Sequence, residues 1–449
     1  MFMLSNHYIV KHFNKTLALS SLVIAISTLN YGFDNNGYTT TQAMEPFIRH
    51  FGSFDTRTGK YELPTAWLSM FNSLNYIGFA FGPFWLFGLV NMIADGNLGV
   101  VLGSLISERW GRRWCMFSMS GHAVVCAVIA VTSTTREQIM AARVLNFPMI
   151  VMSTVWLIPE SPRWLLTKGE VGKAHGALLR LRSGTLSPEE IESEFADLQL
   201  ALQMEKEQGR YIEIFQGINR KRTAIIVALN FLQQATGQAF AGSYGAIFVR
   251  SIGTVNPFNM TIINASVNLL MCGVSLFLND RVGRRPLLMA GAAWQAAAII
   301  TMGGLGTISN PSVAVKKATV AMLPLFGGGF CLGWAPLVYV VTTEVTSLHL
   351  RDASQRTAAI VNVVTAFAVN FSIPYLLFDP ANLGSRLGFI FGAVAVVSVC
   401  FTWLFVPECK GKSLEQIDLM FNQGVPLRRF GSYKPADVEF VEVEAKHDD

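Results

Sequence analysis

Two short charged turns hold the residues in this chain that are best suited to strong ionic contacts. Both have the pattern acid, Arg, any residue, Gly, Arg, Arg, and their charged members are Glu108, Arg109, Arg112, Arg113, Asp280, Arg281, Arg284 and Arg285. The glycine permits a tight turn, and the arginines can donate to carboxylates at neighbouring helix ends. The alternative is that these arginines only reflect the excess of basic residues in the cytoplasmic loops of membrane proteins. Because the turn occurs twice, at equivalent places in a repeat, we favour a charge network that holds one end of a helical bundle closed.

A further carboxylate lies at the end of an apolar stretch. Asp34, in YGFDNNG, ends the first segment that is long enough to cross a bilayer. An ionisable group at membrane depth is unfavourable, so its presence predicts a functional role. The alternative is that Asp34 caps a helix at the membrane surface.

The sequence contains no nucleophile–base pair, no Walker loop and no histidine or cysteine spacing typical of a metal site. The glycine run 327–329 lies inside an apolar stretch, which indicates close helix packing rather than phosphate binding. We therefore expect neither an enzyme nor a cofactor.

The composition indicates what positions these residues. Hydrophobic residues make up 51% of the 449 and charged residues only 14%, whereas a soluble domain carries about a quarter charged residues. The apolar residues fall in blocks of about 20, the length of a membrane span. The net charge of +5 includes no dense basic run, so we expect no nucleic-acid partner. Spans are predicted at roughly 16–34, 66–106, 114–132, 139–158, 222–249, 258–279, 286–308, 317–343, 355–378 and 387–406.

Lysine and arginine gather in one set of the predicted loops, which places both termini in the cytoplasm. The polar stretch 159–221 separates two membrane blocks and is expected to contain a helix that begins at Ser187 and Pro188. The predicted organisation is an incomplete N-terminal transmembrane bundle (1–158), a cytoplasmic linker with amphipathic helices (159–221), a six-helix C-terminal bundle (222–406) and a cytoplasmic tail (407–449).

The first membrane block does not match the second. Residues 83–99 interrupt what would otherwise be one span, which suggests an insertion. Residues 139–158 read as the start of one helix joined to the end of another. Two helices are therefore missing relative to the second block. Because an even number of spans is lost, each later loop stays on the same side of the membrane.

Six segments together resemble the signatures of the sugar porter family of the major facilitator superfamily, in particular its fungal hexose and disaccharide transporters. The segments, in order, are ERWGRR, PESPRWLLTKG, QQATGQ, DRVGRR, PLVYVVTTE and PECKGKSLEQID. The resemblance implies an all-α membrane protein with a two-bundle fold. Relative to the family's twelve transmembrane helices, about ten are expected here, with parts of helices 4 and 6 fused, helix 5 missing and an insertion in helix 2.

The resemblance also implies a substrate site between the two bundles. The residues that match family positions for sugar binding are Gln233, Gln234, Asn268, Tyr339 and Asn370. An amide both donates and accepts, which suits a neutral polyol, although helix–helix hydrogen bonding is the alternative for adjacent glutamines. Adjacent residues do not share a helix face, so at most one of the two glutamines is expected to be structural. For Tyr339, packing at a helix interface is an equal alternative to stacking on a sugar ring. Ala239 stands where the family usually has Asn, which removes one expected sugar contact.

Proton coupling and gating are likewise implied by the resemblance. In proton-coupled members an Asp at the place of Asp34 titrates against an Arg that matches Arg143. The expected gate network contains the charged residues of the two turns together with Glu160, Arg163, Glu344, Arg351 and Glu408.

The function expected from this resemblance is transport of a sugar or related polyol by alternating access, coupled to protons. We expect a multi-pass monomer in the plasma membrane, whose partners are the sugar, protons and the lipid bilayer. The alternative is a membrane protein that does not transport: a sugar sensor, or the inactive product of a truncated gene model. The short tail argues against a sensor, whereas the insertion and the missing helices favour an inactive product.

Overall fold

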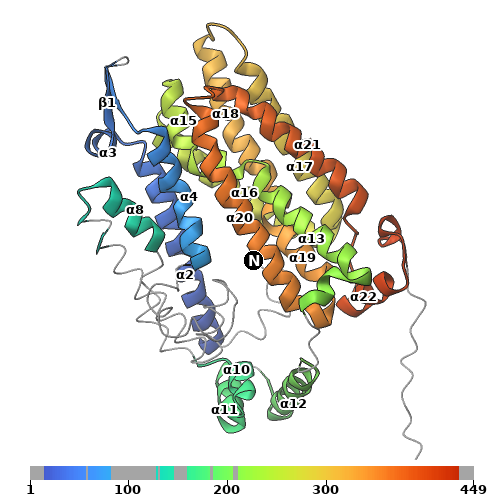
Figure 1. Cartoon of the computed structure of the whole chain (residues 1–449). Helices are drawn as coiled ribbons and strands as arrows, with labels where there is room; N and C mark the ends of the chain where they lie inside the picture. Colours follow the sequence, from blue (N-terminus) through green and yellow to red (C-terminus); the bar gives the residue numbers. More distant parts are fainter. Residues whose placement is uncertain are drawn as a thin grey trace, which may run out of the picture.

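The computed structural model describes residues 15–56, 59–81, 128–129, 132–145, 159–182, 186–205 and 211–433. Long helices that run roughly side by side make up most of this part of the chain (Figure 1). The elements up to residue 205 are α2 (Lys15–Thr41), α3 (Glu45–Phe51), β1 (Ser53–Asp55), β2 (Lys60–Glu62), α4 (Thr65–Phe81), α8 (Arg136–Leu145), α10 (Pro162–Thr167), α11 (Val171–Arg182) and α12 (Pro188–Glu205). The later elements are η2 (Tyr211–Phe215), α13 (Gly217–Ala235), α14 (Gln238–Ser243), α15 (Gly245–Ile252), α16 (Pro257–Val282), α17 (Arg284–Leu305), α18 (Val313–Gly329), η3 (Phe330–Trp334), α19 (Ala335–Val345), η4 (Leu348–Leu350), α20 (Arg351–Leu377), η5 (Gly384–Arg386), α21 (Leu387–Phe405), α22 (Leu414–Asn422) and η6 (Leu427–Arg429).

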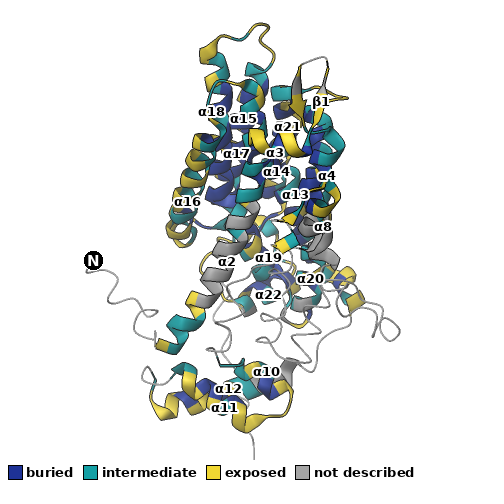
Figure 2. Ribbon diagram, turned by 90° about the vertical axis from the view of Figure 1, so that its left-hand side faces the viewer, coloured by how far each residue is buried: buried dark blue, intermediate teal, exposed yellow. Residues whose placement is uncertain are grey.

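Five helical stretches among the described residues are long and apolar enough to cross a membrane. They are Pro257–Val282, Arg284–Leu305, Val313–Val345, Ala353–Leu377 and Gly384–Phe405, and they coincide with the last five spans expected from the sequence. Large apolar side chains remain on their outward faces; Leu269 and Phe277 on α16 are both 77% exposed (Figure 2). Acyl chains can cover such faces, while each backbone polar group stays bonded within its helix. The prediction of a helical membrane protein is confirmed.

The span expected over 222–249 is not one continuous helix, because the chain breaks there into α13, α14 and α15. The first break lies at Gly237, whose φ is +85°. A Cβ at this position would lie 2.4 Å from the ring of Phe391 on α21. Glycine is therefore required twice over, by the left-handed backbone and by the close approach of the ring.

A π-helical turn, η3, interrupts the span expected over 317–343. It lies where α18 and α19 pack closely on α17: a Cβ at Gly333 would lie 2.6 Å from the Leu287 carbonyl oxygen, and one at Gly329 would lie 3.1 Å from that of Gly291. The expectation that the glycine run 327–329 serves helix packing is confirmed.

Helices α10, α11 and α12 form a small separate layer at one end of the molecule (Figure 1). The helix expected from Ser187 and Pro188 is confirmed as α12. The Ser187 hydroxyl accepts from the Glu190 amide at 3.3 Å, and the Glu190 carboxylate accepts from the Ser187 amide at 2.8 Å, which is a capping box. The apolar face of α12, with Ile191 and Phe195, packs on α10 and α11.

At the opposite end, which carries β1 and β2, α4 packs along α20. The Ser69 hydroxyl donates to the Phe371 carbonyl at 2.5 Å, and Leu68 is buried in an apolar cluster with Phe240 and Ile373. We call this the hairpin end. Its two sides are in contact, so this end of the bundle is closed.

Some predictions on the first membrane block fall outside the described residues. These are the insertion at 83–99, much of the fused span at 139–158, and with them the total of about ten spans. They stay predictions.

Candidate functional site

A cavity of about 410 Å³ lies between the N-terminal helices and the first helices of the second block; we call it the central cavity. Its walls come from α2 and α4 on one side and from α13, α14, α15, α16 and α18 on the other. The residues that can form hydrogen bonds are Asn36, Thr39, Thr40, Tyr76, Gln234, Gln238, Ser243, Thr261, Asn264 and Asn268. None of the described residues that line it is charged. Its chemistry is that of amides and hydroxyls.

The break at Gly237 positions two glutamines of this cavity. Gln234 is in the last turn of α13 and Gln238 is the first residue of α14, so the two amides line the wall from either side of the break. The Gln234 side-chain nitrogen donates to Asn362 at 3.1 Å. The Oε1 of Gln238 is buried and has no partner among the described residues.

Two asparagines on α16 face the same space. Asn264 and Asn268 are one helical turn apart, and both side-chain oxygens are buried without a partner among the described residues. Gly327 on α18 makes room for them, because a Cβ there would lie 2.5 Å from the Asn268 oxygen and 2.9 Å from that of Asn264. Leaving a buried polar group unpaired costs about 1–3 kcal/mol. Three such oxygens in one cavity point to a ligand that donates hydrogen bonds.

Gln233 does not line the cavity, although it was predicted with Gln234 to bind substrate. It is 1% exposed, and its amide donates to the Trp334 carbonyl at 2.9 Å and accepts from Asn362 at 2.7 Å. Asn362 also contacts Asn230 at 3.4 Å. This amide network joins α13, η3 and α20, and the expectation that the adjacent glutamines point in different directions is met.

Asn370 and Tyr339 also lie outside the central cavity. Asn370 is fully buried in α20, where its side chain donates to the Ala366 carbonyl at 2.8 Å and its own carbonyl accepts from the Tyr244 hydroxyl at 2.8 Å. Tyr339 is 55% exposed on α19. Of the five predicted substrate residues, the structure brings Gln234 and Asn268 together.

The predicted proton-coupling residues lie in helices whose side chains there are not described. Asp34 is in α2 and Arg143 is in α8. Because α2 continues to Thr41, Asp34 lies inside the helix rather than at its end. The expectation that the helix ends near Asp34, and the capping role that depends on it, are therefore wrong.

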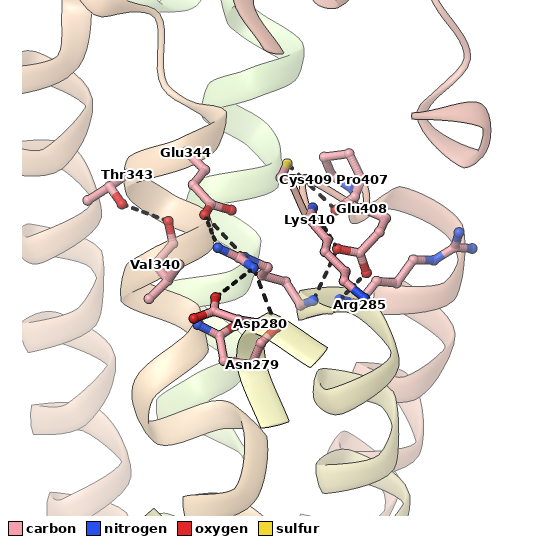
Figure 3. Close-up of polar contacts among 11 residues, drawn as sticks. Asn279, Asp280, Arg285, Val340, Thr343, Glu344, Pro407, Glu408, Cys409 and Lys410 are labelled. Atoms are coloured by element: carbon pink, nitrogen blue, oxygen red, sulfur yellow. Dashed lines mark hydrogen bonds and ion pairs between the residues drawn. The ribbon is translucent and has the colours of Figure 1, made fainter. Parts of the chain in front are cut away.

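A charged cluster of Asp280, Arg284, Glu344 and Glu408 lies near α22, at the opposite end from the hairpin in Figure 1. Figure 3 shows Asp280, Glu344 and Glu408 gathered around this end of α17. The Arg284 guanidinium donates twice to Glu344 on α19, at 2.9 and 3.1 Å, and once to Asp280 at the end of α16, at 3.4 Å. The side chains of Arg284 and Glu344 are only 14% and 15% exposed. The second charged turn thus ties three helices together at this end.

Glu408, in the segment after α21, closes the same turn from outside. Its carboxylate accepts from the backbone amides of Arg284 at 3.1 Å and Arg285 at 3.0 Å, and from that of Lys410 at 3.0 Å. Gly283 has a φ of +108°, and a Cβ there would lie 2.7 Å from the Glu408 carboxylate. The glycine of the turn therefore brings a carboxylate onto the N-terminus of α17, where the helix dipole favours it.

The other predicted gate residues have different surroundings. Arg285 donates to the Trp403 carbonyl, and the Arg281 carbonyl accepts from Lys410. Arg351, at the start of α20, forms no ion pair with another described residue. Glu160 accepts from the Ser161 amide at 3.0 Å, and Arg163 lies in α10. The first-turn residues Glu108, Arg109, Arg112 and Arg113 lie outside the described ranges.

Sequence reasoning missed an ion pair that fixes the C-terminal helix α22. The Arg222 side chain, only 3% exposed, pairs with Asp418, donates to the Asp418 carbonyl at 3.2 Å and lies 4.4 Å from the centre of the Phe421 ring. The signal was present, since Asp418 ends the LEQID motif. Nearby, burial raises the pKa of the Cys409 thiol well above its usual value.

Comparisons with known proteins agree with this geometry. A family model described as "Sugar (and other) transporter" matches residues 144–421, more than half of the chain. The MFS transporter fmqE of Aspergillus fumigatus is 25% identical over 90% of this chain and 86% of its own length. The hexose transporter HXT8 of Saccharomyces cerevisiae is 22% identical over 97% of this chain and 87% of its own length. The xylose transporter XylE from E. coli, in a partially occluded inward-open conformation, has a TM-score of 0.57 at 18% identity, over 89% of this chain and all of the other; the two share the fold.

Proposed function

Because this chain belongs to the sugar (and other) transporter family of the major facilitator superfamily, we propose that it carries a neutral polyhydroxylated molecule, a sugar or related polyol, across a membrane by alternating access. The observation that carries this proposal is the amide-lined central cavity between α2 and α4 on one side and α13–α16 on the other, whose described lining residues carry no charge. A charged substrate would find no opposite charge among the described residues that line it. A sugar offers hydroxyl donors to the unpartnered amide oxygens and hydroxyl acceptors to the amide nitrogens.

Four amides bind the substrate in this proposal: Gln234, Gln238, Asn264 and Asn268. The first and last were expected from the sequence, and the other two come from the geometry of the cavity. Gln233 supports them from outside the cavity, because it holds Asn362, which in turn accepts from Gln234. The cavity volume of about 410 Å³ suits a molecule of monosaccharide or disaccharide size.

Alternating access requires that the two ends of the bundle open in turn. The contact of Ser69 with Phe371 and the buried Leu68 close the hairpin end in this state. At the other end we assign the charged cluster to the gate, in which Arg284 and Glu344 hold α17 against α19. We place the charged cluster and both termini in the cytoplasm, the hairpin end outside, and the monomeric protein in the plasma membrane.

We also propose that transport is coupled to protons through Asp34 and Arg143. Asp34 lies inside α2, within one helical turn of Asn36, which lines the central cavity together with Thr39 and Thr40. Protonation of Asp34 would release Arg143 and change the balance between the two open states.

Uptake by the full 449-residue chain in a transport-null host tests the function. We expect saturable uptake of labelled D-glucose or maltose that is not competed by charged molecules of similar size, such as gluconate and glucosamine. Surface protein that accumulates none of the neutral sugars at pH 5 or pH 7.5 would contradict the proposal and favour the non-transporting alternative.

A further inference from the structure

A second, larger cavity of about 980 Å³ lies at the hairpin end, and we call it the vestibule. Its walls are α3 and the hairpin β1–β2 on one side, and α15 and the residues after α20 on the other. The vestibule shares no lining residue with the central cavity. The two elements of its first wall stand together at the tip of the molecule in Figure 1.

An aromatic pair lines the hairpin wall. Phe54 on β1 and Tyr61 on β2 are paired across the two-stranded ladder, and their ring centres lie 5.3 Å apart in an edge-to-face arrangement. Such a pair stabilises the hairpin, but the contact does not bury it: Phe54 is 55% exposed and Tyr61 46% exposed. Exposed rings at the wall of a cavity offer apolar faces on which the C–H face of a sugar can stack.

Hydrogen-bonding groups lie on both sides of the vestibule, on α3 beside the hairpin and on the wall opposite. Arg49 pairs with Glu45 at 2.6 Å on α3, and Arg250 on α15 donates to the Ala43 carbonyl at 2.6 Å. Across the cavity, Asn382 donates to Asp379. These contacts hold the side chains in place while each guanidinium and carboxylate keeps further donors or acceptors for a ligand.

The described lining of the vestibule carries charges of both signs: Arg49 and Arg250, and Glu45, Glu62 and Asp379. An ion would meet an opposite and a like charge together, whereas adjacent hydroxyls of a polyol can donate to a carboxylate and accept from a guanidinium. The floor connects the vestibule to the transport path. Leu68 lines the vestibule, and the next residue, Ser69, donates to the Phe371 carbonyl. Gln42 also lines it and exchanges two hydrogen bonds with Asn72 on α4, at 3.0 and 2.9 Å.

We propose that the vestibule is a second binding site for the neutral polyhydroxylated substrate, occupied before the hairpin end opens to the central cavity. This inference rests on the proposed function and assigns a separate site to the same class of molecule. Tyr61 and Phe54 stack on the sugar, and the charged side chains opposite them bind its hydroxyls.

Equilibrium binding of labelled D-glucose to the purified full chain in lipid nanodiscs tests the proposal. Four forms are compared: the natural sequence, Tyr61→Ala, Gln238→Ala and the double variant. The natural sequence should bind in two components. Tyr61→Ala should weaken one of them about tenfold, as expected for a lost stacking contact together with its buried area, and Gln238→Ala should weaken the other.

Two further variants separate stacking from damage to the hairpin. Tyr61→Phe keeps the ring and should retain both components. Ser251→Trp, on α15, fills the vestibule from the opposite wall, leaves the hairpin sequence unchanged and should remove the same component as Tyr61→Ala.

The outcomes distinguish this inference from the function on which it rests. A single component that Gln238→Ala abolishes and Tyr61→Ala leaves intact would overturn the vestibule site and keep the transporter. No glucose binding to the natural sequence would overturn both. Tighter vestibule binding of labelled choline than of glucose would show that the aromatic pair and the carboxylates serve a cation, and would also overturn the proposal.

Discussion

Substitution of Gly237 by alanine tests whether glycine holds the helix break that positions Gln234 and Gln238. An alanine at a φ of +85° is strained by about 1–2 kcal/mol. Its Cβ would also lie 2.4 Å from the Phe391 ring, and such overpacking typically costs about 1–3 kcal/mol. We therefore expect Gly237→Ala to lower the free energy of unfolding by about 2–5 kcal/mol.

Thermal unfolding of the purified chain measures this loss. At about 2 °C per kcal/mol, the melting temperature should fall by at least about 4 °C. Gly242→Ala is the matched control, because Gly242 lies in α14, has no atom within 4 Å of an added Cβ and does not have a positive φ. It should change the melting temperature little.

A double variant divides the loss between its two causes. Phe391→Ala removes the ring atoms that the new Cβ would meet, so combined with Gly237→Ala it should be less destabilising than the two single losses added together, by about 1–3 kcal/mol. Equal melting temperatures for Gly237→Ala and Gly242→Ala would refute the reasoning, and so would strict additivity of Gly237→Ala and Phe391→Ala.

Three further predictions concern the charged residues. Glu344→Ala leaves the largely buried Arg284 with its longer contacts to Asp280 and to the Asn279 carbonyl, both at 3.4 Å. Thermal unfolding should show a loss of about 3 kcal/mol in the free energy of unfolding, whereas the exposed control Glu189→Ala should have almost no effect. Arg222→Ala removes the partner of Asp418 and should loosen α22, so that maleimide labelling of the buried Cys409 becomes at least about tenfold faster. Arg220→Ala, which changes an exposed neighbour, should leave the labelling rate unchanged. Equal labelling rates in the two variants would contradict the role of the ion pair. Asp34→Asn should abolish the rise of sugar uptake between pH 7.5 and pH 5, and an unaltered pH profile would exclude Asp34 from proton coupling.

The membrane helices and the charged turn could be predicted because their signals are local. A run of about 20 apolar residues specifies a span wherever it packs, so the last five spans were placed correctly. The second turn carries its own acid, glycine and arginines. The contacts of this turn with Glu344 and Glu408 link residues far apart in sequence. They could be anticipated only because Glu344 and Glu408 belong to segments that resemble the family's signatures.

The arrangement of the amides could not be predicted in the same way. Which of the adjacent Gln233 and Gln234 faces the cavity depends on how α13 is turned within the bundle, and the break that follows lies at Gly237, against a ring on α21. Gln238 and the neighbouring Ala239 both line the cavity, and Ala239 also belongs to an apolar cluster. Asn362 lies in none of the quoted motifs, yet it links Gln233 to Gln234.

The most direct test of the central claim is the KM for sugar uptake by Gln238→Ala and Asn264→Ala, measured with the amount of each variant at the membrane. Removal of either amide leaves a substrate hydroxyl unpaired, so we predict that KM rises about tenfold while the surface amount is unchanged. Gln216→Ala serves as the control, because Gln216 is exposed just before α13 and lines neither the central cavity nor the vestibule. An unchanged KM in both Gln238→Ala and Asn264→Ala, with normal uptake, would contradict the assignment of the central cavity as the substrate site.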